Sequence, residues 1–159
     1  MTNVQPIPEG HHTITPHIVV DGASDAIAFY IKAFGAEEIC RMPTPDGRLM
    51  HAEIKLGDSL VYLCDEFPEH GCEPRNPRAL GGSSCTLHIY TADCDAAIQR
   101  ALDAGATLRM PAADMFWGDR YGGVTCPWGH EWSFATHIAD LTPEEIAAAA
   151  DAIFGGSGD

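Results

Sequence analysis

Residues 15–18 read T-P-H-I, and residues 86–89, which lie 71 positions later, read T-L-H-I. Each segment is followed by a helix-like stretch that starts with Asp-Ala, at Asp25 and at Asp95. These stretches end in F-G-A at residues 34–36 and in A-G-A at residues 104–106, which are 70 positions apart. Because the strands before them are 71 positions apart, we expect the second half to lack one residue in the turn between strand and helix. A repeated period indicates repeated structural units. The sequence therefore predicts two similar halves with a cleft between them, in which His17 and His88 form a matched pair.

Hydrophobic spacing and turn residues predict the same order of elements in both halves. In the first half we expect strands at residues 15–20, 36–42, 50–56 and 59–65, and a helix that Ser24 caps and that runs to about Phe34. In the second half we expect strands at residues 85–91, 107–110, 121–125 and 131–136, and a helix at about 93–104. The fold class is therefore α+β, with two tandem βαβββ modules.

The predicted domain organisation has three parts. Residues 1–12 form an N-terminal extension, residues 13–137 the two-module domain, and residues 138–159 a C-terminal helix and tail. Within the domain, module 1 spans about 13–66, an irregular Pro- and Gly-rich connector spans 67–83, and module 2 spans about 84–137. The tail helix starts at T-P-E-E, residues 142–145, which is a capping box with proline at the first helical position.

The composition excludes several classes of partner. The net charge is −14, from 23 acidic and 9 basic residues, which argues against binding to nucleic acid or to an anionic membrane surface. No apolar run approaches the roughly 20 residues that span a bilayer, and residues 1–10 show no secretion signal. The six cysteines form no C-x-x-C pair, so we expect reduced thiols in a cytoplasmic protein.

Several segments beyond the repeat resemble a known family. They are H-A-E at residues 51–53 leading into G-D-S at 57–59, D-E at 65–66, F-W-G at 116–118, Y-G at 121–122 and W-G-H-E-W at 128–132. Over residues 13–137 the chain resembles the vicinal oxygen chelate superfamily, which includes glyoxalase I, extradiol dioxygenases and the fosfomycin and bleomycin resistance proteins, and within it the PhnB-like group. The resemblance implies curved mixed sheets around a shared cleft, and it is compatible with several chemistries or with pure ligand binding.

The resemblance also places the usual metal ligands of the superfamily, one on the first strand and one on the last strand of each module. The first-strand positions fall on Thr15 and Thr86, and the last-strand positions on Ser133 and near Tyr62. Hydroxyl groups are poor ligands for a divalent metal compared with imidazole or carboxylate. We therefore predict no cofactor by the usual route, although a divalent metal stays possible through a shifted set of ligands.

Strand alternation assigns a set of polar and aromatic side chains to the cleft. These candidate ligand-binding residues are His17, His51, Glu53, Tyr62, His88, Tyr90, Trp117, Arg120 and Glu131. They could bind a polar ligand and move protons, bind a metal, or be solvated residues of an exposed sheet face. Arg120 offers a planar fork for a carboxylate or phosphate, or a surface pair with Asp119. His11 and His12 are expected to be exposed near the chain end.

The sequence leads to two hypotheses about function and one about the oligomeric state. The first is a binding protein that holds a small polar molecule in the cleft. The second is a divalent-metal-dependent lyase or dioxygenase-like enzyme that uses His17, His88 and a carboxylate from Glu53 or Glu131. A homodimer is expected in either case because members of the superfamily commonly pair, and the tail helix could extend the dimer.

Overall fold

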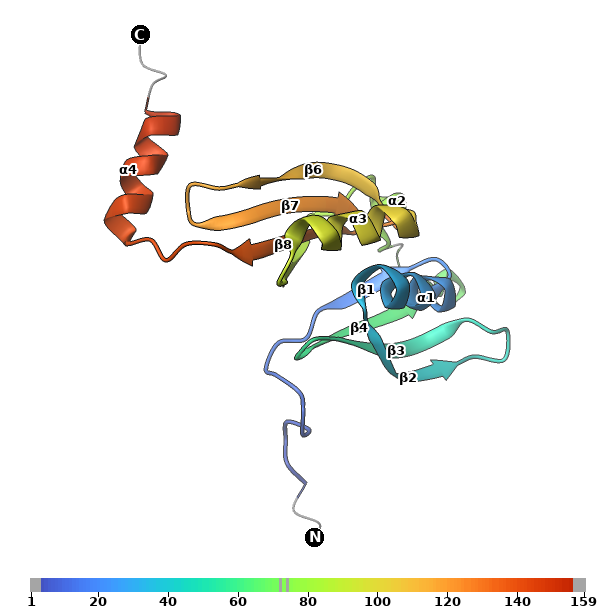
Figure 1. The fold of residues 1–159 in the computed structure, drawn as a ribbon. Coiled ribbons are helices and arrows are strands. Elements are labelled where there is room, and N and C mark those ends of the chain that lie inside the picture. Colours follow the sequence, from blue (N-terminus) through green and yellow to red (C-terminus); the bar gives the residue numbers. More distant parts are fainter. Residues whose placement is uncertain (1–3, 72, 74, 156–159) are drawn as a thin grey trace. The chain divides into compact units, whose positions relative to one another are not determined.

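The computed structural model describes residues 4–71, 73 and 75–155. The chain divides into two compact units, Met1–Gly82 and Ser83–Asp159, and each contains one four-stranded sheet (Figure 1). The first unit contains β1 (His17–Val20), α1 (Ala23–Phe34), β2 (Glu37–Pro43), β3 (Leu49–Leu56) and β4 (Ser59–Asp65), followed by the short helices η1 (Pro68–His70) and α2 (Pro77–Leu80). The second contains β5 (Thr86–Tyr90), α3 (Cys94–Ala104), β6 (Thr107–Asp114), β7 (Asp119–Thr125), β8 (Glu131–His137) and α4 (Pro143–Phe154).

The two sheets have the same topology, which confirms the tandem βαβββ fold. Their strand orders are β1-β4-β3-β2 and β5-β8-β7-β6. The first strand of each module pairs in parallel with the last, and the other pairs are antiparallel. His17 lies opposite Tyr62 in the first module as His88 lies opposite Ser133 in the second, so the matched pair of histidines is also structurally equivalent.

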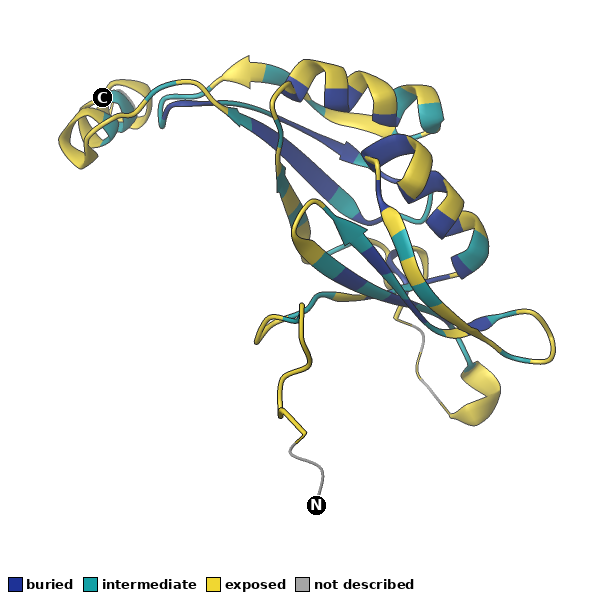
Figure 2. Ribbon diagram, turned by 60° about the horizontal axis from the view of Figure 1, so that its bottom comes forward, coloured by how far each residue is buried: buried dark blue, intermediate teal, exposed yellow. Residues whose placement is uncertain are grey.

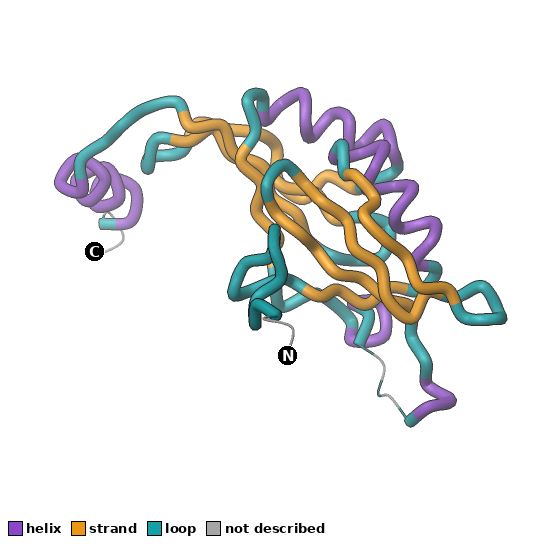
Figure 3. The backbone as a smooth tube through the Cα atoms, turned by 90° about the horizontal axis from the view of Figure 1, so that it is seen from below, coloured by secondary structure: helices purple, strands orange, loops and turns teal. Residues whose placement is uncertain are grey.

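One helix packs on one face of each sheet (Figure 3). In the first module Ile27 and Tyr30 of α1 and Ile54 and Leu63 of the sheet are almost completely buried. In the second module Trp132 and Phe134 are buried in the same way. Figure 2 shows buried segments on both the strands and the helices. The helix-covered faces therefore form the two apolar cores, and alternation places the polar side chains on the opposite faces.

The location of the lost residue differs from the prediction. The 71-residue offset persists to the first residues of the helices, Ala23 and Cys94, whereas the glycines that end them, Gly35 and Gly105, are 70 apart. Helix α1 has 12 residues and α3 has 11. The missing residue therefore falls within the second helix and not in the turn before it.

The start of α1 also differs from the prediction. Ser24 does not cap this helix, because its N-cap residue is Gly22, which has no side chain. The carboxylate of Asp65, at the end of β4, instead accepts hydrogen bonds of 2.8 Å from the backbone N–H groups of Gly22 and Ala23. A contact between residues 43 positions apart leaves no local signal in the sequence.

Within the described part of the chain, the structure also tests the predictions for β6, α4, the cysteines and membrane-spanning helices. Strand β6 runs four residues beyond its predicted end and includes Pro111, with register shifts along its pairing with β7. The capping box of α4 is confirmed, with Thr142 and Glu145 bonded reciprocally. Cys40, Cys85 and Cys94 are free thiols, and Cys72 lies outside the described residues. Among the helices that the structure describes, none is long and apolar enough to cross a bilayer.

Candidate functional site

Four side chains of the first module form a row across its sheet, on the face opposite α1. Cys40 of β2 lies opposite Glu53 of β3, Glu53 lies opposite Tyr62 of β4, and Tyr62 lies opposite His17 of β1. His51 is two residues before Glu53, so it shares this face. The structure therefore brings together the four residues of this module that the sequence predicted, His17, His51, Glu53 and Tyr62, and adds Cys40.

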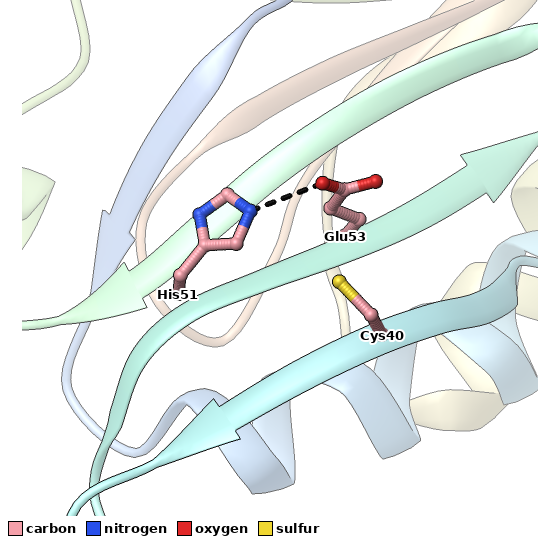
Figure 4. Close-up of side chains that lie close together, drawn as sticks. All are labelled: Cys40, His51 and Glu53. Atoms are coloured by element: carbon pink, nitrogen blue, oxygen red, sulfur yellow. Dashed lines mark hydrogen bonds and ion pairs between the residues drawn. The ribbon is translucent and has the colours of Figure 1, made fainter. Parts of the chain in front are cut away.

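The polar atoms in this row are close to one another. The Nε2 atom of His51 lies 3.2 Å from Oε1 of Glu53, and one donor atom from each of Cys40, His51 and Glu53 lies within 4.8 Å of the other two (Figure 4). The ring of Tyr62 meets that of His51 edge to face, with centroids 4.9 Å apart. Burial, with the neighbouring Glu53 carboxylate, raises the pKa of the Cys40 thiol.

His17 is the outer member of the same group. Its ring centroid lies 6.3 Å from that of His51 and 6.2 Å from that of Tyr62. Partial burial lowers the pKa of His17, and the nearby His51 imidazole lowers it further. His17 is therefore expected to be neutral at neutral pH, with a lone pair available for a proton or a metal.

His11 belongs to this group, in contrast to the prediction that it is exposed at the chain end. Its side chain is 22% exposed, and its Nε2 atom lies 3.9 Å from Oε2 of Glu53. Its ring also contacts that of Tyr62 at 6.1 Å. The adjacent His12 is exposed, as expected. The sequence contains no signal for this contact, because it depends on the path of the extension across the sheet.

The second module presents aromatic rings on the equivalent face. His88 stacks on Tyr121, with centroids 5.8 Å apart and an angle of 17° between the planes, and it meets Tyr90 edge to face at 4.8 Å. Trp117 meets Tyr121 edge to face at 5.9 Å. The Nδ1 atom of His88 lies 2.8 Å from Oγ of Ser133, which fixes the ring plane. We call His88, Tyr90, Trp117 and Tyr121 the aromatic face; Tyr121 was not predicted.

A buried carboxylate lies at the end of the aromatic face. Asp119, which is 6% exposed, accepts hydrogen bonds from the hydroxyl of Tyr90 at 3.2 Å and from Nε1 of Trp117 at 3.1 Å. Its other oxygen lies 2.8 Å from Nδ1 of His137. Burial by itself would raise the pKa of Asp119, but the hydrogen bonds from His137, Tyr90 and Trp117 outweigh it, so this pKa is lowered. The same contact, with Asp140 beyond it, raises the pKa of His137.

The two remaining candidates have protein partners of their own. Glu131 accepts a hydrogen bond from the hydroxyl of Thr86 at 3.2 Å and lies 3.6 Å from Nε of Arg109. Arg120 binds Asp95 of α3 and Asp114 of β6, so its guanidinium lies with the helix and not with the aromatic face. It does not pair with Asp119, because neighbouring strand residues point to opposite faces.

Comparison with known proteins places this fold in a family. The model of the glyoxalase/bleomycin resistance protein/dioxygenase superfamily matches residues 10–134. The chain belongs to this superfamily. It is 44% identical over 148 residues to the uncharacterized protein Rv0887c of Mycobacterium tuberculosis, covering 92% of this chain and 84% of the relative.

Solved structures share this fold. The X-ray structure of the Arabidopsis thaliana At5g48480 product has a TM-score of 0.63 and 29% identity, covering 79% of this chain and 98% of that one. The structure described as the PhnB protein of Bacillus cereus, a putative 3-demethylubiquinone-9 3-methyltransferase, has a TM-score of 0.60 and 17% identity, covering 79% of this chain and 99% of that one. At that identity the likeness concerns the fold alone.

Many members of the superfamily use a divalent metal, so its usual ligand positions can be tested against this structure. Thr86 donates its hydroxyl hydrogen bond to Glu131, and Thr15 lies before β1 begins. The last-strand positions hold Tyr62 and Ser133, which lie opposite His17 and His88. These four positions offer hydroxyl groups and no imidazole or carboxylate, so they do not fit the metal that the family uses.

Proposed function

We propose that this chain is a PhnB-like protein that binds a small polar molecule with a planar ring, without the usual metal of its superfamily. The aromatic face of the second module carries the proposal. Aromatic side chains supply large apolar contacts and favour offset or edge-to-face contacts with another ring. The nearby Asp119 adds a fixed negative charge and a set of ordered hydrogen bonds, which together favour a ligand with both a ring and polar groups.

Preorganisation supports binding over a purely structural role for these rings. Tyr90 is 64% exposed, yet its hydroxyl group is held by Asp119 and its ring contacts His88. An exposed aromatic ring that is already held in place loses little side-chain entropy when a ligand stacks on it. His88 is held in the same way through Ser133, so two ring planes are set before a ligand arrives.

A ligand screen tests the proposal. The full-length chain would be screened by thermal shift against planar heteroaromatic compounds with carboxylate, hydroxyl or amine groups, and hits would be measured by calorimetry. We expect a hit that loses at least about tenfold in affinity in His88→Ala and in Tyr121→Leu. His12→Ala, a change at an exposed histidine of the N-terminal extension, should leave the affinity unchanged. Equal affinity in all variants would contradict binding at the aromatic face.

The same compound distinguishes binding from catalysis. If the chain is a binding protein, chromatography should recover the compound intact after prolonged incubation with it. Consumption of the compound that depends on an added divalent metal would instead support the alternative, a metal-dependent lyase or dioxygenase-like enzyme. Both outcomes are read from one incubation series, with and without metal.

We also propose that the chain forms a homodimer in the cytoplasm. The apolar side chains of Ile138, Ile153 and Phe154, near and in α4, are 50–68% exposed, and association of two chains would remove such surface from water. The free thiols of Cys40, Cys85 and Cys94 fit a reducing compartment. Sedimentation at micromolar concentration should give the mass of two chains, and a monomer mass would refute the dimer.

A further inference from the structure

We propose that the first module holds a zinc-type divalent metal through Cys40, His51 and Glu53, with His11 as the fourth ligand. These residues lie on β2, β3 and the N-terminal extension, and none occupies the first-strand or last-strand positions that the superfamily uses. The proposal does not depend on ligand binding at the aromatic face, which belongs to the other module.

The distances suit a compact ion. One donor atom from each of Cys40, His51 and Glu53 lies within 4.8 Å of the other two, with Nε2 of His51 at 3.2 Å from Oε1 of Glu53. Around a tetrahedral ion with bonds of about 2.0–2.3 Å, ligand atoms lie about 3.3–3.6 Å apart. These three donors therefore need to approach one another by about 1.5 Å at most, which side-chain rotation supplies. Figure 4 shows the three side chains on the same side of their two strands.

The backbone positions explain why these donors converge. Cys40 lies directly opposite Glu53 in the antiparallel pair of β2 and β3, where the Cβ atoms of facing residues are about 4.5–5.5 Å apart. His51 and Glu53 are separated by one residue of the same strand, so they point to the same face. Ligands on paired strands are held more rigidly than ligands on loops.

His11 has the orientation of a metal-binding histidine. Its Nδ1 atom lies 3.2 Å from the backbone carbonyl oxygen of Glu9, and a carbonyl can only accept, so Nδ1 carries the proton. In the neutral ring the lone pair is therefore on Nε2, the atom that lies 3.9 Å from Oε2 of Glu53. Metal-binding histidines characteristically donate their second ring N–H in this way, which fixes the tautomer and the ring plane.

The mixture of donors selects the kind of metal. A thiolate is a soft ligand that magnesium and calcium do not take, because these ions bind oxygen. A set of one sulfur, two imidazole nitrogens and one carboxylate oxygen suits zinc, or cobalt in its place. Binding would convert the Cys40 thiol to a thiolate and release its proton to solvent, and it would attach the extension to the sheet.

Cobalt titration tests the site directly. Tag-free, full-length, chelator-treated protein kept reduced should bind one Co²⁺, with a thiolate-to-cobalt charge-transfer band and the ligand-field bands of a tetrahedral ion, and Zn²⁺ should abolish both. The charge-transfer band should disappear in Cys40→Ser and persist in Cys64→Ser, a half-buried thiol of the same sheet. No charge-transfer band in the unaltered protein, or a band that persists undiminished in Cys40→Ser, would overturn the proposal.

Affinity measurements assign the other ligands. Competition with a chromophoric chelator should show at least about tenfold weaker zinc binding in His51→Gln, Glu53→Gln and His11→Ala, since even changes beyond the ligands cost about 10–100-fold. His12→Ala serves as the matched control and should leave the affinity unchanged. Unchanged affinity in His11→Ala would overturn the assignment of the fourth ligand.

A measurement on the unaltered protein keeps the test valid if a variant fails to fold. X-ray absorption of the zinc-loaded chain should show one sulfur at about 2.3 Å and nitrogen or oxygen ligands at about 2.0–2.1 Å. A spectrum with nitrogen and oxygen ligands alone would exclude Cys40 and refute the site.

Discussion

Asp65 and Thr136 occupy equivalent positions, 71 residues apart, at the ends of β4 and β8, and each binds the N-terminus of the helix in its own module. Asp65 accepts hydrogen bonds from the backbone N–H groups of Gly22 and Ala23, and Thr136 Oγ1 accepts one from the N–H of Cys94 at 2.8 Å. The first N–H groups of a helix have no partner within the helix. In both modules, a side chain at the equivalent position of the last strand accepts hydrogen bonds from these groups.

The first prediction concerns the larger role of Asp65. Its second oxygen also accepts a 2.7 Å hydrogen bond from the backbone of Leu49, so one buried carboxylate joins α1, β3 and β4. Asp65→Ala should lower the free energy of unfolding by about 2–4 kcal/mol, because it removes charge-assisted bonds and leaves buried donors without partners. Urea denaturation measures the loss.

The second helix provides the control for this prediction. Asp93 is the N-cap of α3, and its side chain accepts a hydrogen bond from the N–H of Ala96 in the same helix. Asp93→Ala should therefore cost about 1 kcal/mol, the usual value for an N-cap. Equal losses in the two variants would show that Asp65 acts as an ordinary cap and does not tie the sheet to the helix.

The second prediction concerns the pair Asp119 and His137. Contact with Asp119 raises the pKa of His137 above its unfolded value, so the stabilisation from this pair is fully present below about pH 6.5 and is lost as the pH rises through the folded pKa. Asp119→Asn should lower the pKa of His137 and destabilise the chain most near pH 6. NMR titration of the imidazole and urea midpoints at several pH values measure both effects.

Asp140 offers the matched control for this pair. It contacts the other ring nitrogen of His137 at 3.0 Å but is fully exposed, where an ion pair is screened by solvent. Asp140→Asn should change the pKa of His137 less than Asp119→Asn does. The reverse order would contradict the central role assigned to Asp119.

The third prediction concerns His130, which lies in the turn before β8 and is 8% exposed. Burial lowers its pKa to about 4, and its Nδ1 atom has no hydrogen-bond partner in the described structure. The unfolded state binds the proton more readily, so stability should fall as the pH drops from about 6.5 to about 4, by roughly 2–3 kcal/mol in total.

A variant separates His130 from the other acid-sensitive groups. His130→Gln cannot take up this proton, so its thermal midpoint should fall less steeply between pH 6.5 and 4 than that of the unaltered chain. Parallel curves for the two proteins would mean that the acid sensitivity arises elsewhere. The remaining titratable groups are common to both proteins and cancel in the comparison.

The fourth prediction concerns Gly118, which directly precedes Asp119. Its φ is +96°, and a Cβ atom there would lie 2.3 Å from the backbone oxygen of Ala139. Gly118→Ala should destabilise the chain by at least about 3 kcal/mol, since strain and overlap with backbone add together. Gly47 has a similar φ of +90° with open space around it, so Gly47→Ala should cost about 1–2 kcal/mol. Thermal unfolding of both variants should show a larger loss of stability for Gly118→Ala, because steric overlap with Ala139 adds to the backbone strain that both variants share.

Local pattern was sufficient to predict the order of the strands and of the three longer helices, with most of their limits. The short helices η1 and α2 lie in the connector that was predicted to be irregular. Strand β4 begins at Ser59 and ends at Asp65, as its alternation and turn residues predict. Helix α4 begins at the predicted capping box of Thr142. The predicted strand stops at Met110, whereas β6 continues through Pro111, which a register shift between Met110 and Ala113 accommodates.

The candidate site was predicted in part. Alternation placed His17, His51, Glu53 and Tyr62 on one face, and pairing of the strands shows why they are neighbours. The same reasoning could not find Cys40, His11 or Asp119, because their contacts are made across strands or from the extension.

The sequence by itself determined the repeat, the alternation of polar and apolar residues, and the helix signals, because each of these depends on residues a few positions apart. Tertiary structure alone decided which distant groups meet: Asp65 with the start of α1, Asp119 with Tyr90 and His137, and His11 with Glu53. Strand register and the path of the chain bring these groups together. Those are set by the packing of the whole module, which no short stretch of sequence encodes.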